Sequence, residues 1–168
     1  IIMATVTTPE TVYAFYALNR LGVIPNMVDP RTSTEGIREY IREVEAKVVL
    51  TLDVAYPKIE KAIIGTNVDK IIVTSPADSL PPVKKALFLL SERIKNNTYC
   101  FGENCVVWKQ FIKSGNSTVP GDVPYEKDFC CVIVHTGGTT GLPKGVMLSN
   151  ENVNALVLQS ILTGIDMK

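Results

Sequence analysis

The chain has 168 residues, of which 46% are hydrophobic and 20% are charged, proportions typical of a globular protein with one substantial core. Seventeen basic residues balance seventeen acidic ones, so the formal net charge is zero. Binders of nucleic acid or anionic membranes usually carry a basic excess, and the balance argues against both partners. No apolar run approaches the roughly 20 residues that a transmembrane segment requires.

The cysteines and the chain ends bear on where the protein works. The four cysteines match neither a C-x-x-C pair nor a zinc-binding pattern. Cys130 and Cys131 stand in an apolar run, where reduced thiols act as small hydrophobic groups. No signal peptide is visible, so we expect a cytoplasmic location. The chain opens on Ile1 within a strand-like run and reaches Lys168 without a helix stop signal, so we expect a piece of a longer protein.

Strand and helix signals alternate from the beginning of the chain. Residues 2–6 are apolar and partly β-branched, as in a buried strand. Thr8-Pro9-Glu10 supplies an N-cap, a first-turn proline and an acidic residue near a helix N-terminus, so a helix is predicted from here to Gly22. Residues 23–28 predict a second strand.

The next segment continues the alternation. Thr32 and Glu35 form a capping-box pattern, and apolar residues at helical spacing from Ile37 predict a helix with one apolar face. Residues 48–52 and 71–74 are apolar runs, typical of strands that are covered on both faces. A weaker helical pattern lies between them.

The middle of the chain carries weaker signals. Pro81-Pro82 precedes a predicted helix with one apolar face over residues 83–94. Residues 96–127 are the least regular part of the sequence, with only a short helical signal at residues 108–113. We therefore expect mostly loop structure in this part.

The last part of the chain returns to strands. Residues 129–134 and 146–148 predict two strands, and Ser149 can cap a final helix. Strands separated by helices imply β-α-β crossovers, so the predicted fold is α/β: a mainly parallel sheet with helices on both faces. The last two strands, with the loop between them, predict a strand–loop–strand hairpin near the C-terminal end.

The loop of this hairpin has the composition of a phosphate-binding segment. From His135 to Gly145 it holds four glycines, three threonines and Lys144, and it holds no carboxylate. Glycines allow backbone N–H groups to approach a bulky anion closely, and threonine hydroxyls add donors. The lysine adds a full positive charge, so the loop suits a polyphosphate.

The spacing excludes the two best-known phosphate loops. The P-loop requires a hydroxyl residue after its lysine, and here Gly145 follows Lys144. The dinucleotide fingerprint G-x-G-x-x-G also fails. Both of those loops open directly into a helix, whereas a strand follows this one, so the loop is expected to hold phosphate with its own backbone and side chains. The alternative, a solvated surface hairpin, requires the whole pattern to be coincidental.

Residues 136–149, Thr-Gly-Gly-Thr-Thr-Gly-Leu-Pro-Lys-Gly-Val-Met-Leu-Ser, resemble the signature T-[SG]-G-[ST]-T-G-x-P-K-G of the adenylate-forming enzymes. That superfamily includes acyl- and aryl-CoA synthetases, luciferases and the adenylation domains of peptide synthetases. Asn152 and the helix after it match the usual continuation. Residues 8–30 and 46–49 are similar to the region that these enzymes carry ahead of the loop.

Two positions depart from the superfamily pattern. His135 stands where an aromatic residue such as tyrosine is common, and Asn150 stands where a histidine is often found. His135 is the single histidine of the sequence, which excludes a His-pair metal site and disfavours a Ser-His-Asp triad. We expect it to be a structural residue beside the loop.

The resemblance implies a domain organisation. Residues 1–168 would be a fragment of the large N-terminal domain of an adenylate-forming enzyme, resembling acyl-CoA synthetases. Within it, residues 1–113 would form an α/β subregion, residues 114–127 a linker loop, and residues 128–168 the phosphate-loop hairpin with its following helix.

The resemblance also implies an activity. An acid–thiol ligase of this kind, acting for example in fatty acid metabolism, uses ATP and Mg²⁺ to convert a small carboxylate into an acyl-adenylate, then transfers the acyl group to a thiol such as coenzyme A. Lys144 and Thr139 are the expected catalytic residues. Nucleotide contacts are expected from Thr136, Gly137, Gly138, Thr139, Thr140, Gly141 and Lys144.

Other parts of that machinery are expected outside this sequence. In the superfamily, the acidic residue that helps to hold Mg²⁺, the ribose-binding aspartate and the lysine of a mobile C-terminal domain all follow the loop. No metal ligand is expected here, and residues 1–168 alone should not turn over. Two alternatives stay open: an amino-acid-activating adenylation domain, and a non-catalytic nucleotide-binding module.

Overall fold

The computed structural model describes residues 1–94, 102–115, 121–137 and 144–164. Its centre is a seven-stranded sheet in the order β5-β4-β3-β1-β2-β6-β7. Every neighbouring pair is parallel except β6 and β7, which form an antiparallel hairpin. The predicted α/β fold with a mainly parallel sheet is therefore confirmed.

The elements follow one another as the sequence pattern predicted, with one additional strand. The strands are β1 (Ile2–Ala4), β2 (Asn26–Val28), β3 (Val48–Leu52), β4 (Lys70–Thr74), β5 (Cys105–Val107), β6 (Cys130–His135) and β7 (Gly145–Ser149). The helices are α1 (Pro9–Arg20), α2 (Thr34–Glu43), α3 (Tyr56–Ala62), α4 (Pro82–Ile94), α5 (Trp108–Lys113) and α6 (Asn150–Leu162), with a 3₁₀ turn, η1 (Asp53–Ala55), before α3.

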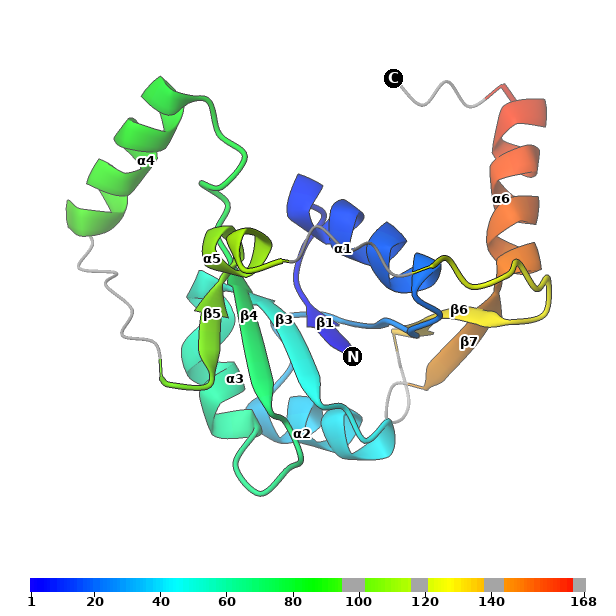
Figure 1. Cartoon of the computed structure of the whole chain (residues 1–168), viewed down its shortest axis with the longest axis horizontal. Coiled ribbons are helices and arrows are strands. Elements are labelled where there is room, and N and C mark those ends of the chain that lie inside the picture. The colour runs from blue at the N-terminus through cyan, green and yellow to red at the C-terminus, as the bar shows by residue number, and fades with distance from the viewer. Residues whose placement is uncertain (95–101, 116–120, 138–143, 165–168) are drawn as a thin grey trace.

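Two hydrophobic clusters cover the two faces of the sheet. Successive strand side chains point to opposite faces, so Ile2 joins one cluster while its neighbour Met3 joins the other. On the first face α2 and α3 pack Ile37, Ile41 and Ile59 onto the sheet. On the opposite face α1 and α5 lie over β1, β3 and β4 (Figure 1).

The ends of α1 follow from the signals in the sequence. The hydroxyl of Thr8 accepts a hydrogen bond from the backbone N–H of Thr11 at 3.3 Å and caps the helix N-terminus. At the other end Gly22 has φ +67°, a left-handed conformation that costs glycine little and that stops the helix. The chain can then turn directly into β2.

The capping box predicted at Thr32 and Glu35 is wrong. The N-cap of α2 is Ser33, whose hydroxyl accepts from the N–H of Gly36 at 3.1 Å. Thr32 instead belongs to the preceding turn, because its N–H donates to the carbonyl of Asp29 and its own carbonyl accepts from Lys58 Nζ. The helix therefore begins one residue later than the motif suggested.

Strand β5 was not predicted, since residues 96–127 gave only a helical signal. It is three residues long and pairs with β4 at the edge of the sheet. Because β5 is short, lies at the sheet edge and is only partly buried, its sequence carries no long apolar run that would have predicted a strand. The short helix predicted at residues 108–113 is present as α5.

Helix α4 carries the predicted apolar residues but leaves them exposed. Val83, Leu87 and Leu90 are 74%, 63% and 56% exposed, and no other described element covers them. Figure 1 shows α4 extending away from the β5 end of the sheet. Within the described ranges no helix is both long and apolar enough to cross a membrane.

The corrected cap predicts a difference between two neighbouring hydroxyl residues. Ser33→Ala should lower the free energy of unfolding by about 1 kcal/mol, because it removes the acceptor for the Gly36 N–H. Thr32→Ala is the matched control and should change it by less than about 0.5 kcal/mol. Urea denaturation of both variants measures this, and a larger loss from Thr32→Ala would contradict the assignment.

Candidate functional site

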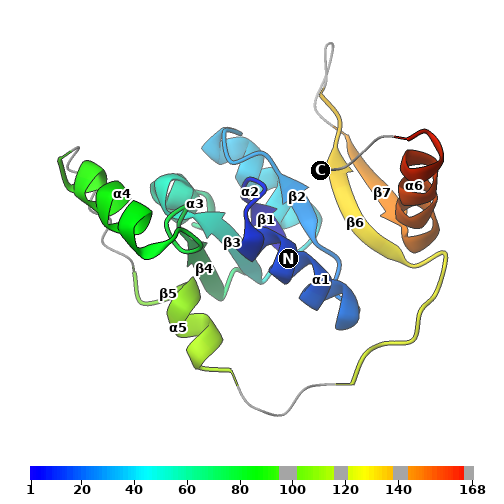
Figure 2. The ribbon, with the colours of Figure 1, turned by 90° about the horizontal axis from the view of Figure 1, so that it is seen from above.

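The β6–β7 hairpin places the glycine–threonine loop at the carboxyl edge of the parallel sheet. Strand β6 runs parallel to β2, with Asn26 opposite Ile133, and antiparallel to β7, with His135 opposite Gly145 (Figure 2). The loop leaves the end of β6 at the edge where β1 and β2 also end. In α/β sheets this carboxyl edge is where ligands usually bind.

The two ends of the loop are hydrogen-bonded to each other. The N–H of Thr136 donates to the carbonyl of Lys144 at 3.1 Å, and the N–H of Lys144 donates to Thr136 Oγ1 at 3.3 Å. As an acceptor in this contact, the Thr136 hydroxyl keeps its own proton for another partner. The loop thus begins and ends at a hydrogen-bonded pair, Thr136 and Lys144, which we call the base of the loop.

The predicted site residues that the structure describes are exposed at this base. Thr136, Gly137 and Lys144 are all open to solvent, and a Cβ added at Gly137 would meet no heavy atom within 4 Å. Lys144 forms no ion pair with any described residue. The other predicted contacts lie outside the described residues: Gly138, Thr139, Thr140 and Gly141.

Below the loop, His135 connects three elements. Its Nε2 lies 2.7 Å from Oδ1 of Asn26 on β2, and its ring lies against the ring of Tyr40 on α2, with the centroids 4.0 Å apart. Burial lowers the pKa of the imidazole, and the negative charge of Glu43 partly offsets this effect. These contacts connect His135 to β2 and α2, and its burial favours the neutral form of the ring.

The sequence offered no signal for the partners of His135. Asn26 lies 109 residues away along the chain, in a strand whose other residues are apolar. Only the parallel pairing of β2 with β6 brings the two side chains together. Tyr40 lies at helical spacing from Ile37, on the predicted apolar face of α2, and it packs against the core.

A cavity of about 530 Å³ opens at the same carboxyl edge, beside the ends of β1 and β2. Arg31 and Asp29 line it and form an ion pair of 2.6 Å. The hydrogen bond from Arg31 is the largest cause that lowers the pKa of Asp29 to about 2. Both side chains thus stay charged at neutral pH.

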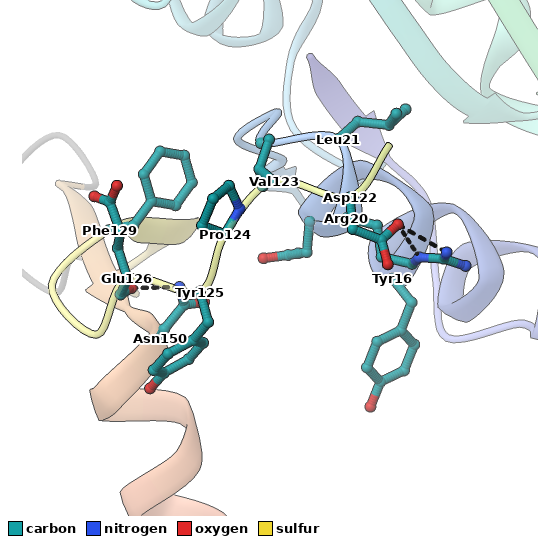
Figure 3. A pocket seen from close by; sticks show the side chains of 12 residues that line it. Tyr16, Arg20, Leu21, Asp122, Val123, Pro124, Tyr125, Glu126, Phe129 and Asn150 are labelled. Atoms are coloured by element: carbon teal, nitrogen blue, oxygen red, sulfur yellow. Dashed lines mark hydrogen bonds and ion pairs between the residues drawn. The ribbon is translucent and has the colours of Figure 1, made fainter. Parts of the chain in front are cut away.

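A second cavity, of about 570 Å³, lies at the opposite end of the hairpin (Figure 3). Phe129 precedes β6 and Asn150 follows β7, and both line it. Its one basic side chain, Arg20, is paired with Asp122 at 2.7 Å, and Asn150 Nδ2 donates to the carbonyl of Glu126 at 2.7 Å. This cavity is separate from the loop, and its one basic side chain is already paired.

The described residues do not form a metal site. None of them make up a group of three histidine, cysteine, aspartate or glutamate side chains that could hold an ion. A cation bound to a polyphosphate would have to arrive with its ligand or be held by other residues.

The chain belongs to the AMP-binding enzyme family, whose sequence model matches residues 1–167. This confirms the resemblance drawn from the loop. A long-chain-fatty-acid–CoA ligase of Bacillus subtilis (strain 168) is 33% identical over 155 residues, which cover 88% of the chain and 27% of that protein. The 4-coumarate–CoA ligase 1 of Solanum tuberosum is 28% identical over 153 residues, or 91% of the chain and 23% of that protein.

A solved structure shares the fold. The crystal structure of a long-chain-fatty-acid-CoA ligase from Archaeoglobus fulgidus superposes with a TM-score of 0.69 at 22% identity, over 97% of this chain and 27% of that one. The chain thus spans about a quarter of the length of the proteins it matches.

An added methyl group is predicted to destabilise the protein at one glycine of the hairpin and to have little effect at another. Gly145→Ala should lower the free energy of unfolding by about 1 kcal/mol, because the new Cβ would lie 3.2 Å from Ile133 Cγ2 and 3.4 Å from His135 Cε1. Gly137→Ala, whose Cβ meets open space, should change it by less than about 0.5 kcal/mol. Thermal unfolding of both variants measures the difference, and equal losses would contradict the packing at Gly145.

Proposed function

We propose that the protein carrying this chain is an acid–thiol ligase that activates a carboxylic acid with ATP. The observation that carries the proposal is the exposed base of the loop, with Thr136, Gly137 and Lys144, in a chain of the AMP-binding enzyme family. Relatives named as CoA ligases and as acetyl-coenzyme A synthetase support a thiol such as coenzyme A as the acceptor.

The proposed reaction has two steps. A carboxylate oxygen of the acid attacks the α-phosphorus of ATP, the bond from that phosphorus to the bridging oxygen breaks, and pyrophosphate leaves. The sulfur of a thiol then attacks the acyl carbonyl carbon and loses its proton to solvent. The bond from that carbon to the phosphate oxygen breaks, and AMP leaves with its electron pair. In the first step negative charge accumulates on the departing pyrophosphate.

The role proposed for the loop is to bind the β- and γ-phosphates and to stabilise that charge. Donors already aimed at the leaving group need no reorganisation during the reaction. Lys144 would supply a positive charge, with Thr139 as the second catalytic residue. Further contacts would come from Thr136, Gly137, Gly138, Thr140 and Gly141.

Mg²⁺, ribose and acyl-group contacts are assigned in this proposal to residues outside the chain. The described residues form no metal site, and the relatives are about four times as long as the part that matches. We further propose that residues 1–168 lie within the large N-terminal domain of the whole enzyme. On this account catalysis requires the rest of the protein, including a mobile C-terminal domain.

The reaction predicts acid-dependent isotope exchange. The full-length protein should incorporate labelled pyrophosphate into ATP only when a carboxylic acid is added, because the reverse of the first step needs the acyl-adenylate. A panel of a long-chain fatty acid, 4-coumarate and acetate covers the acids in the names of the relatives. Exchange without acid, or none with any acid of a broad panel, would count against the reaction.

Lys144 predicts a loss of rate without a loss of fold. A charge-assisted hydrogen bond contributes about 1.5–3 kcal/mol, so Lys144→Ala should slow pyrophosphate exchange about 10- to 100-fold. The side chain is exposed and makes no described ion pair, so stability should change by less than about 1 kcal/mol.

The matched control is Lys84→Ala, which removes an exposed lysine from α4. It should leave the exchange rate unchanged. If Lys144→Ala exchanges as fast as Lys84→Ala does, the lysine has no role at the phosphates. If it unfolds the protein, the loop is a structural element.

A further inference from the structure

His135 packs closely against Asn26, Tyr40 and Gly145, and these three residues are called its seat below. On one side Asn26 contacts its Nε2 at 2.7 Å, and on another the ring of Tyr40 lies with its centroid 4.0 Å away. On β7, a Cβ built on Gly145 would approach its Cε1 to 3.4 Å and its Nδ1 to 3.8 Å. The imidazole thus joins β2, α2 and β7 at the residue that immediately precedes Thr136.

The hydrogen-bonding groups of this seat suit a neutral ring. Oδ1 of Asn26 can only accept, so Nε2 carries a proton, and in the neutral ring Nδ1 then carries a lone pair. Nδ1 is buried without a partner among the described residues. A second proton would have to occupy Nδ1, where no described acceptor waits and water is excluded, so a charged ring would be poorly accommodated.

The second polar group of the seat is equally constrained. Asn26 is only 1% exposed, and its Nδ2 has no hydrogen-bond partner in the described part of the chain. The hydrogen bond with His135 is thus the one side-chain hydrogen bond that Asn26 makes among the described residues. A buried donor that is left without a partner costs free energy.

We propose that His135 is a positioning residue: its neutral imidazole, seated between Asn26, Tyr40 and Gly145, fixes the base of the 136–144 loop in the arrangement that binds the triphosphate. This inference rests on the proposed function, because it assumes that the loop binds ATP. It adds that ATP affinity depends on the protonation state of a side chain that does not touch the nucleotide.

The ionisable groups around the seat set the direction of the pH effect. From α2, Tyr40 stays neutral, with a pKa raised by burial, and Glu43 favours the charged imidazole. Strands β2 and β7 contribute no ionisable side chain, β6 contributes only the thiols of Cys130 and Cys131, and exposed Lys144 adjoins Gly145. Desolvation outweighs the attraction of Glu43, so the imidazole pKa falls below its ordinary value of 6.5.

The sign of the effect follows from this lowered pKa. Well above pH 6.5 the ring is neutral whether it is seated or displaced, and the pH has no effect on the seat. As the pH falls below that value, a displaced ring takes up a proton more readily than a seated one. A fall in pH therefore raises the ratio of displaced to seated rings, by at most tenfold per pH unit for a single proton. A displaced ring no longer fixes the base of the loop at Thr136 and Lys144.

Calorimetric titration of the full-length protein with Mg-ATP tests the proposal between about pH 7.5 and about pH 5.5. The dissociation constant of the wild type should rise in acid more than that of His135→Gln. Glutamine can donate to Asn26 but does not ionise. Because ATP also titrates in this range, the informative quantity is the ratio of the two constants at each pH.

At the high end of the range, His135→Gln should bind within about threefold of the wild type, and the ratio should change by at most about tenfold as the pH falls from 6.5 to the low end of the range. His135→Tyr, which also cannot gain a proton here, should show the same smaller rise of the dissociation constant in acid. It replaces the glutamine variant if that variant fails to fold. Lys144→Ala should bind more weakly at every pH while keeping the wild-type pH dependence.

The outcomes separate the two proposals. If both His135 variants keep the wild-type pH dependence, the positioning role is overturned while ATP binding stands. If the wild type binds no Mg-ATP at any pH, the proposed function fails, and the inference that rests on it fails too.

Discussion

The pairing of β6 on both of its edges is the constraint on which the candidate site depends. On one edge β6 continues the parallel sheet through β2, and on the other it turns back into β7. A glycine-rich loop has little intrinsic preference for one conformation, so its geometry must come from its ends. Here both ends are fixed, because His135 and Gly145 are paired and Thr136 and Lys144 close the first turn.

The two ends of the hairpin differ in how far their polar groups are exposed or paired. At the loop end, backbone and hydroxyl donors and a lysine are left exposed. At the opposite end two polar contacts are made: Arg20 pairs with Asp122, and Asn150 donates to the backbone of residue 126 (Figure 3). These contacts tie the start of α6 and the segment before β6 to the end of α1. The hairpin is therefore anchored away from the place where a ligand would bind.

The sequence predicted what local patterns encode. The alternation of strands and helices, the cap at Thr8 and the hairpin itself all depend on residues close together in the chain, and all were confirmed. The cap of α2 was misassigned by one residue because the turn after Asp29 uses the backbone of Thr32. The contact between Asn26 and His135 could not be predicted, since only the order of the strands brings them together. The middle of the loop stays a prediction from its motif.

The central claim is that the amides of the loop bind the phosphate chain of a nucleotide. Hydrogen–deuterium exchange of the full-length protein over residues 136–145, with saturating Mg-ATP and then with adenosine, tests it most directly. The account predicts slower exchange of these amides with Mg-ATP and no change with adenosine, which lacks phosphates. Bound Mg-ATP that slows exchange elsewhere while leaving these amides unchanged would contradict it.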